Sequence, residues 1–217
     1  MKTTRLLALS IAMFVVAQAA AAAEEPVVAD EDSALKPEQT AGTETVTSQV
    51  EEKTMPDKML IAYFSWSDGK NTRAAAETIQ ELTGGKIFQI KPVTPYSRDY
   101  DEVVAVGKKE LADGTKPEIE PFSQDIAQYD VIFIGSPIWF GTYAPPVATF
   151  LTAHDLAGKR VVPFSTYGGG GSGRYASEVA KLCPQSDVLQ EFSCAGKRVR
   201  EAQEDIRKWL QSLNLAR

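Results

Sequence analysis

The sequence predicts an α/β fold, a doubly wound, five-stranded parallel sheet with helices on both faces. From residue 58 onward, short apolar runs alternate with segments whose apolar residues recur every three or four positions. This alternation is typical of strands and helices around a parallel sheet, and five such units can be counted. Residues 131–134 are wholly apolar and rich in β-branched side chains, as expected for a central strand buried on both faces.

The strands and helices of the first half follow in order. Residues 59–64 form the first strand, and Thr72 is expected to cap a helix that stops at Gly84 and Gly85. Residues 86–90 form the second strand. A second helix is predicted from an apolar pattern with steps of three and four residues, made of Tyr100, Val103, Val104, Gly107 and Leu111.

The second half continues the alternation. Strands are predicted at residues 131–134, 160–164 and 187–192, with a helix following each. The helices are recognised by their apolar residues, which are Val147, Phe150 and Leu151, then Tyr175, Val179 and Leu182, and finally Val199, Ala202, Ile206, Trp209, Leu210 and Leu213. The last of these stripes should pack on the sheet.

The 217-residue chain carries a formal charge of −6 that is unevenly distributed. Residues 1–23 carry +2, residues 24–57 carry −8, and residues 58–217 are neutral. A neutral globular part has no basic field to hold a nucleic-acid backbone, so no nucleic-acid partner is expected. The 43% of hydrophobic residues suits a globular domain and excludes the fibrous and wholly disordered classes.

The amino-terminal region has the order of a secretory signal, since Lys2 and Arg5 precede an apolar stretch and an alanine-rich one that ends at Ala23. The strongly apolar part, residues 6–16, is shorter than the roughly 20 residues needed to span a bilayer. We therefore expect an exported protein, periplasmic or secreted, without a stable membrane anchor after cleavage of residues 1–23; a retained anchor is the alternative. Residues 24–57 predict a disordered acidic linker, with a docking tail as the alternative, and residues 58–217 the folded domain.

Three unusual segments follow the first, third and fourth predicted strands, where open parallel sheets bind their ligands. The first, residues 65–72, offers hydroxyls, an amide and free backbone N–H groups at a helix start, which suits a phosphate. A plain capped turn is the alternative. The segment matches neither a P-loop nor a dinucleotide fingerprint.

The other two segments suit a flat ring. Residues 135–143 place Trp139, Phe140 and Tyr143 at an exposed strand end, although core packing is the usual role of such residues. Residues 165–173 contain four consecutive glycines, which let the backbone approach a ligand closely, and Tyr167 offers a second stacking face. A flexible loop without a ligand is the alternative for this segment.

Together these loops resemble the flavin mononucleotide (FMN) site of the flavodoxin-like family, over residues 59–213. The resemblance implies the strand order 2-1-3-4-5 and a bound FMN. It implies that Ser65, Ser67, Asn71 and Thr72 hold the phosphate with help from Lys70, that Pro137, Ile138, Trp139, Phe140 and Gly141 border the ring with Trp139 stacked on it, and that Thr166, Tyr167, Gly168 and Gly169 line its other side. A peptide flip at Gly141 would accept a hydrogen bond from reduced flavin. The short connection at residues 193–199 resembles the short-chain form.

The phosphate segment departs from the family pattern, because Asp68, Gly69 and Lys70 stand where a single glycine is expected. The loop is two residues longer and gains a carboxylate that would repel a phosphate. Either the added residues bulge outward, with Lys70 offsetting the charge, or the phosphate site is degenerate. We favour the outward bulge.

Other reactive residues carry weaker signals. Cys183 and Cys194 flank the fifth strand, and a disulfide between them requires α-carbons within about 7 Å, which leaves both outcomes open. His154, the only histidine, suits helix capping or packing rather than a metal cluster. No Gly-x-Ser-x-Gly elbow is present, which disfavours a serine hydrolase.

The function expected from the resemblance is that of an FMN-binding electron carrier that exchanges electrons with redox partner proteins outside the cytoplasm. One alternative is an FMN-dependent NAD(P)H or quinone oxidoreductase, in which Tyr143, Tyr167 and the glycine loop would shape a substrate pocket. Another is a degenerate flavodoxin-like domain that binds no flavin.

Overall fold

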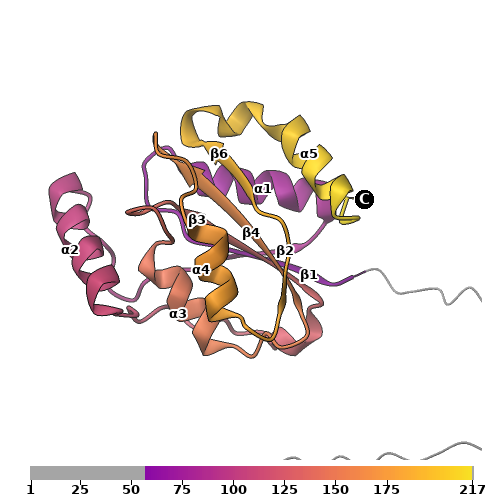
Figure 1. Ribbon diagram of the computed structural model, residues 1–217, viewed down its shortest axis with the longest axis horizontal. Coiled ribbons are helices and arrows are strands. Elements are labelled where there is room, and N and C mark those ends of the chain that lie inside the picture. Colours follow the sequence, from indigo (N-terminus) through magenta and orange to yellow (C-terminus); the bar gives the residue numbers. More distant parts are fainter. Residues whose placement is uncertain (1–56, 217) are drawn as a thin grey trace, which may run out of the picture. The chain divides into compact units, whose positions relative to one another are not determined.

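A computed structural model describes residues 57–216, which form a parallel sheet with helices on both faces (Figure 1). The strand order is β2-β1-β3-β4-β5, and every strand pairing is parallel. The predicted doubly wound α/β class and the order 2-1-3-4-5 are therefore confirmed. The predicted signal peptide, residues 1–23, and residues 24–56 of the predicted linker lie outside the described residues.

Strands and helices alternate along the chain. The first half contains β1 (Met59–Tyr63), α1 (Asn71–Thr83), β2 (Lys86–Gln89), α2 (Tyr100–Asp113) and the 3₁₀ helix η1 (Ile126–Gln128). The second contains β3 (Val131–Pro137), α3 (Pro145–Ala153), β4 (Arg160–Tyr167), α4 (Tyr175–Leu182), β5 (Asp187–Val188), β6 (Phe192–Ala195), the 3₁₀ helix η2 (Gly196–Glu201) and α5 (Gln203–Ser212). Because β1, β3 and β4 are neighbours, the three unusual segments meet at one edge of the sheet.

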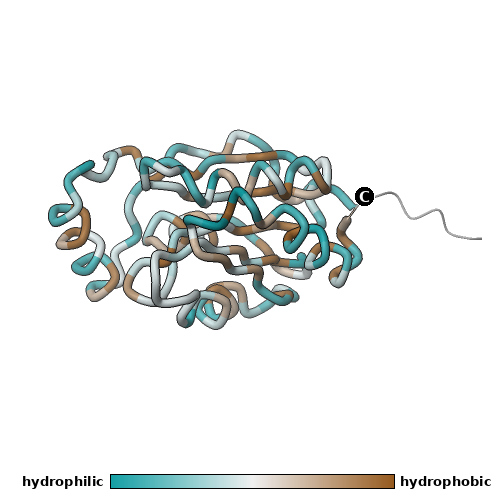
Figure 2. Tube along the Cα trace, turned by 90° about the horizontal axis from the view of Figure 1, so that it is seen from above, coloured by the Kyte–Doolittle hydropathy of each residue, from teal (hydrophilic) through white to brown (hydrophobic). Residues whose placement is uncertain are grey.

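Each face of the sheet carries its own hydrophobic core, because side chains alternate between faces along a strand. In β1, Ile61 and Tyr63 join the core that includes α1 and α5 residues, whereas Leu60 and Ala62 join the core that includes α3 and α4 residues. Figure 2 shows hydrophobic residues concentrated on the strands between the helical layers. As predicted, the central strand β3 is buried at all but its last position.

The fifth strand position is interrupted, which corrects the single strand predicted at residues 187–192. β5 and β6 both pair with β4, and residues 189–191 belong to neither. The indole N–H of Trp209 in α5 donates to the Gln190 carbonyl at 2.9 Å, and the Ser165 hydroxyl donates to the Glu191 carboxylate at 2.5 Å. The Gln190 carbonyl is thus satisfied by α5 rather than by a neighbouring strand, so the ladder stops there.

The start of α1 differs from the prediction that Thr72 caps the helix. The cap residue is Lys70, whose φ of 48° is left-handed, and no side chain caps the helix. Thr72 lies inside the first turn, buried, with its hydroxyl 2.9 Å from that of Thr166. This contact with β4 uses the hydroxyl that a cap would need. The predicted stop is confirmed, because Gly84 has the left-handed φ typical of a helix end.

Helix α2 stands to one side of the sheet (Figure 1). Of its predicted apolar pattern only Val103 and Gly107 are buried, and Tyr100 is 69% exposed. The pattern correctly predicts a helix but not its burial. In the segment that follows the helix, Ile119, Phe122 and Ile126 pack against the core on one face of the sheet. Phe122 in that segment contacts Phe88 and Phe150 edge to face.

The remaining predictions concern residues away from the three loops. The apolar stripe of α5 is buried at Ile206, Trp209 and Leu210. His154 has the predicted packing role, with Nδ1 2.8 Å from the carbonyl oxygen of Phe150. Cys183 and Cys194 are free thiols. Within residues 57–216, no helix is both long and apolar enough to cross a membrane.

Candidate functional site

The loop after β1 bulges into solvent. Asp68, Gly69 and Lys70 are exposed, and the Lys70 N–H donates to the Ser67 carbonyl at 2.9 Å, which closes a tight turn. The Arg98 guanidinium lies 3.5 Å from the Asp68 carboxylate and donates to the Trp66 carbonyl at 2.8 Å. The added carboxylate therefore points outward and has a cation beside it.

The bulged loop leaves hydrogen-bond donors open at the start of α1. The Ala74 N–H donates to the Lys70 carbonyl, so the N–H groups of the three preceding residues have no partner within the helix. The Ser65 hydroxyl oxygen is buried and has no hydrogen-bond partner among the described residues. Open N–H groups at a helix start bind anions, because the helix dipole is positive there.

The Asn71 side chain ties this loop to η2. With its nitrogen turned toward the neighbouring carbonyls, the Asn71 amide donates to the oxygens of Gly69 and Gly196, each at 3.3 Å. The resemblance assigned this amide to the phosphate, but in the structure it is engaged within the protein. The backbone N–H of Asn71 is the donor that it leaves for a ligand.

The segment after β3 forms a tight hairpin turn. Trp139 and Thr142 exchange two backbone hydrogen bonds of 3.0 and 2.9 Å around Phe140 and Gly141. Both turn residues have positive φ, 49° and 79°, as in a type I′ turn. Such a φ is unfavourable for a bulky residue. Phe140 is nevertheless 49% exposed, so this strained turn presents an aromatic ring to solvent.

Trp139 packs in an aromatic cluster. Its indole makes edge-to-face contacts with Phe64, Trp66 and Tyr96, with ring centroids 5.1–6.3 Å apart. It also lies against α2, where a Cβ built on Gly107 would be 2.9 Å from the indole. The structure therefore combines the two roles that the sequence left open for Trp139, since the indole is packed in this cluster and also lines the pocket described below.

The glycine loop after β4 touches the β3 turn. A Cβ on Gly173 would lie 2.3 Å from the Gly141 carbonyl oxygen, and Gly173 has a φ of 61°. The Arg174 N–H donates to the same oxygen at 2.8 Å. In contrast, a Cβ on Gly168 or Gly169 would meet nothing within 4 Å, so their backbone is open to a ligand.

Glu191 contacts residues at the start of the glycine loop. Its carboxylate accepts a hydrogen bond of 2.5 Å from the Ser165 hydroxyl, and the Ser172 hydroxyl and the Ala176 N–H at the start of α4 are nearby donors that act to lower its pKa. Burial raises the pKa of this carboxyl above its ordinary value, against the opposing effect of these donors. The interruption between β5 and β6 is what places Glu191 under the loop.

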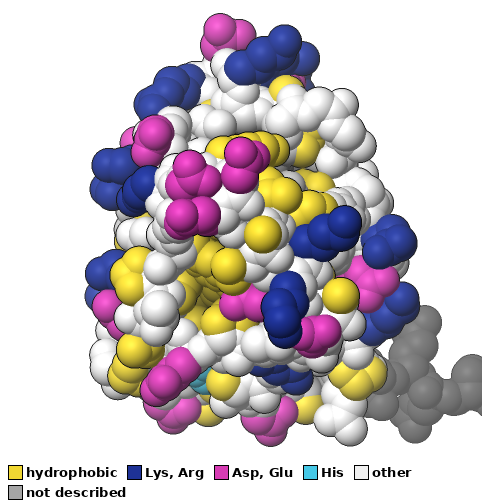
Figure 3. All heavy atoms as spheres, turned by 90° about the vertical axis from the view of Figure 1, so that its left-hand side faces the viewer, with side chains coloured by type: hydrophobic (Ala, Val, Ile, Leu, Met, Phe, Trp, Pro, Cys, Tyr) yellow, Lys and Arg dark blue, Asp and Glu magenta, His cyan; other side chains and the backbone are white. Residues whose placement is uncertain are grey.

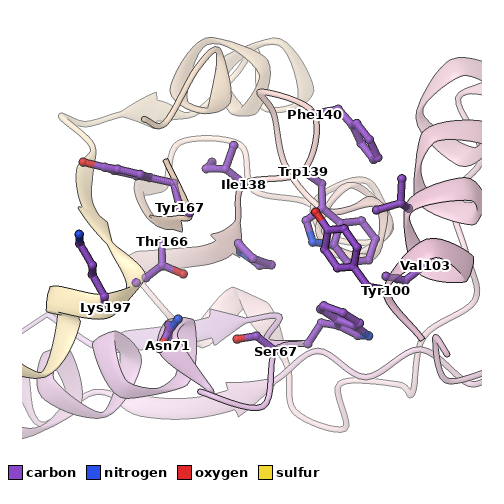
Figure 4. A pocket seen from close by; sticks show the side chains of 15 residues that line it. Ser67, Asn71, Tyr100, Val103, Ile138, Trp139, Phe140, Thr166, Tyr167 and Lys197 are labelled. Carbon is purple, nitrogen blue, oxygen red and sulfur yellow. The ribbon is translucent and has the colours of Figure 1, made fainter. Parts of the chain in front are cut away.

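A pocket of about 520 Å³ lies where the three segments meet (Figure 4). Predicted site residues in its lining are Ser67, Asn71, Pro137, Ile138, Trp139, Phe140, Thr166, Tyr167 and Gly168. Ser65 and Lys70 instead line a smaller recess of about 140 Å³ formed by the same loop. Thr72, Gly141 and Gly169 lie next to lining residues but do not line the pocket.

The structure adds lining residues that the sequence did not suggest, namely Trp66, Tyr100, Val103, Val104, Gly196 and Lys197. Tyr100 and the two valines come from α2, which forms one wall because it stands away from the sheet. Figure 3 faces this side of the molecule and shows hydrophobic side chains exposed among charged ones. Trp66 lies within the predicted phosphate segment, whereas no sequence pattern marks Lys197.

The lining determines what the pocket can do. Among the described residues around it there is no carboxylate, imidazole or thiol, and Lys197 is the single charged side chain. Residues 57–216 contain no cluster of three metal-binding side chains. Aromatic and apolar groups dominate one end, and open backbone donors the other. The arrangement suits a ligand with a flat ring and an anionic tail.

The comparison with protein families gives a match over most of the chain. Residues 58–213 match a family model described as flavodoxin. No curated protein matches the chain.

Solved structures agree with this family. The chain is 33% identical to a protein from Bacteroides eggerthii DSM 20697 described as a flavoprotein, with a TM-score of 0.65, covering 73% of this chain and 98% of that one. It is 26% identical to a flavoprotein from Lactobacillus acidophilus NCFM solved in complex with FMN, with a TM-score of 0.55, covering 67% and 97%. The chain therefore belongs to the flavodoxin family.

Proposed function

We propose that this protein binds FMN in the 520 Å³ pocket and carries electrons between partner proteins. The observation that carries the proposal is the meeting, in one pocket, of a helix start with open N–H donors and an aromatic wall. The related Lactobacillus flavoprotein binds FMN, which supports the same ligand here. The volume lies in the range of about 300–1,000 Å³ that is usual for small-molecule sites.

The residues present fit the two ends of this cofactor. The phosphate would be held by the N–H groups of Asn71, Thr72 and Arg73 and by hydroxyls of the loop, since Ser65 has an unsatisfied buried oxygen. The ring would lie among Ile138, Trp139 and Tyr167, and the open backbone at Gly168 allows close approach.

When bound, FMN supplies the electron-transfer chemistry. The protein's own residues bind and orient it. The Ser165 to Glu191 hydrogen bond would fix the glycine loop, and the aromatic cluster around Trp139 would fix the opposite wall.

Titration of the purified full chain with FMN tests this proposal. Quenching of flavin fluorescence with a saturable, one-to-one dependence is the expected result. A chain that leaves flavin fluorescence unchanged at every concentration would mean that the lengthened loop has cost the domain its cofactor. The degenerate, flavin-free function would then replace the carrier.

A second function, FMN-dependent reduction of a quinone by a nicotinamide, is favoured by one observation. The wall made by Tyr100, Val103 and Val104 extends the pocket beyond the three loops with an apolar surface that suits a second flat molecule. Steady-state oxidation of NADH or NADPH by the FMN-loaded protein, with a quinone present, distinguishes the two functions. Turnover supports the reductase, and its absence supports the carrier.

We also propose that the carrier works outside the cytoplasm, supported by the charged, apolar and alanine-rich order of residues 1–23. Cell fractionation of the host with an antibody to the folded domain tests this location. Recovery with the exported fraction in a shortened form is expected. A full-length protein found only in the cytosol would contradict it.

A further inference from the structure

The segment η2 packs closely against the start of α1. Gly196 is buried, and a Cβ there would lie 2.3 Å from the Asn71 amide. The same amide bridges the carbonyl oxygens of Gly196 and Gly69. The Arg200 guanidinium adds a hydrogen bond of 3.3 Å to the Gly69 carbonyl. The position of η2 is thus fixed relative to the bulged loop.

This position brings Lys197 to the pocket. Lys197 lines it together with Asn71 and Thr166, at the end away from α2 (Figure 4). Its side chain forms no ion pair with any carboxylate among residues 57–216. An ammonium group at the edge of a ligand pocket, without a protein partner, is available to an anion.

The charges around the loop leave this end positive. Asp68 lies beside Arg98, and the Arg73 guanidinium is 2.7 Å from the Glu77 carboxylate. Lys197 and Arg200 have no carboxylate partner among the described residues. The one carboxylate in the bulge is therefore balanced. Counting Lys197, Arg198, Arg200 and Glu201, η2 has a net charge of +2, and Lys70 in the bulge adds a further cation.

A bound phosphate monoester needs positive charge nearby to balance its own negative charge. It carries about −1.5 to −2 charges at pH 7, whereas a helix start supplies only about half a positive charge. Hydroxyls and N–H groups hold the oxygens but add no net charge. Lys197 is the side chain in the pocket lining that can supply the missing positive charge.

We propose that Lys197 makes the pocket selective for a flavin that carries a phosphate, pairing with that phosphate at the mouth of the bulged loop. This inference rests on the proposed function. It assigns Lys197 a binding role that the family resemblance did not include. Through this residue, η2 would contribute to ligand specificity.

The test compares FMN with riboflavin, which lacks the phosphate, by fluorescence titration of the full chain at two salt concentrations. In Lys197→Met, FMN affinity should fall about 10- to 100-fold, as for the loss of a charged hydrogen bond, while riboflavin affinity stays unchanged. The salt dependence of FMN binding should weaken too, because screening acts on the lost charge. Lys197→Arg should retain most of the affinity, and inorganic phosphate should compete with FMN less well in the Met variant.

Lys208→Met, at an exposed position of α5, is the matched control and should behave as wild type. Equal losses for FMN and riboflavin in Lys197→Met would assign a structural role and overturn the inference. So would an unchanged FMN affinity, and both results would leave the proposed function intact. A wild-type chain that binds neither flavin would overturn the proposed function together with the inference.

Discussion

The two ends of the pocket are built in different ways. At the loop end, the Asn71 amide, the Arg200 guanidinium and the Thr72 to Thr166 contact join α1, β4 and η2 to one another. At the α2 end, only Val103 and Gly107 of the helix are buried, and Tyr100 and Phe140 are 69% and 49% exposed. The loop end is held by several hydrogen bonds, whereas the α2 end rests on a few apolar contacts and on one hydrogen bond of 2.5 Å from the Tyr96 hydroxyl to the Glu110 carboxylate.

The phosphate and the ring of the proposed ligand are therefore recognised by different means. A phosphate needs donors at fixed positions, and the loop end provides them on backbone that is tied on both sides. A ring needs apolar area with less strict geometry, and a loosely held helix provides it. Changes at the loop end should therefore alter ligand choice, and most changes at the α2 end should alter affinity alone.

The largest effect is expected from Trp139→Ala, which removes the indole against which α2 packs at Gly107. The indole contacts three aromatic rings and Gly107, so its loss should lower the free energy of unfolding by about 2–3 kcal/mol, below the range for a fully buried tryptophan. Quenching of FMN fluorescence should weaken as well. Urea unfolding measures the first effect. Trp139→Phe, which keeps an aromatic ring, should lose much less, and equal losses would refute the role of the cluster.

Gly196→Ala breaks the loop end. The new methyl group would meet the Asn71 amide, so either this side chain must turn away from η2 or η2 must shift, at a cost near the low end of about 1–3 kcal/mol in stability. FMN affinity should fall further than riboflavin affinity, because the phosphate end is displaced. Gly168→Ala is the control for stability, since a Cβ there meets no protein atom within 4 Å. Thermal unfolding measures the stability of both variants. Equal melting temperatures for Gly196→Ala and Gly168→Ala would contradict the prediction.

Tyr100→Ala changes the α2 end of the pocket without disturbing the fold. The side chain is mostly exposed, so stability should change by less than about 0.5 kcal/mol. Flavin affinity should fall about 2- to 10-fold, as for the loss of one aromatic contact, and equally for FMN and riboflavin. Val106→Ala, an exposed residue of the same helix outside the pocket lining, is the control. If Tyr100→Ala weakened the binding of FMN but not of riboflavin, the phosphate would lie at the α2 end, which would contradict the prediction.

The smallest effect concerns the dependence of stability on pH. Because burial raises the pKa of Glu191, the folded state binds this proton more tightly than the unfolded state does. The resulting stability is present at low pH and is lost as the pH rises from the ordinary value of 4.5 through the raised pKa. Wild type should therefore lose stability relative to Glu191→Gln over this window. Urea unfolding across the window measures the difference, with the exposed Glu204→Gln as control; parallel pH profiles would contradict the prediction.

The sequence predicted those parts of the fold that depend on local pattern. Residues 131–134 are apolar throughout, and β3 is indeed central and buried. Glycines 84 and 85 stop α1 as predicted, since a left-handed residue ends a helix whatever surrounds it. The phosphate, ring and glycine segments converge because parallel strands end at the same edge.

The errors arose where contacts between distant residues decide the outcome. The break in the fifth strand depends on the Trp209 indole reaching Gln190, which no local pattern shows. Tyr100 is exposed because α2 stands to one side of the sheet (Figure 1), which the spacing of its apolar residues does not show. Lys197 reaches the pocket only because Gly196 packs against Asn71, more than a hundred positions away in the sequence.

The loose attachment of α2 has a consequence for protein engineering. Asp99 and Gly114 cap the two ends of α2, and within the helix only Val103 and Gly107 are buried. The helix can therefore be exchanged as a unit, provided that these two residues and Glu110, which accepts a hydrogen bond from Tyr96, are kept. Libraries that randomise its other positions while keeping Gly107, and thereby the contact with Trp139, would vary one wall of the proposed flavin pocket. This chain thus offers a starting point for changing which flat molecules the pocket accepts through a single exchangeable helix.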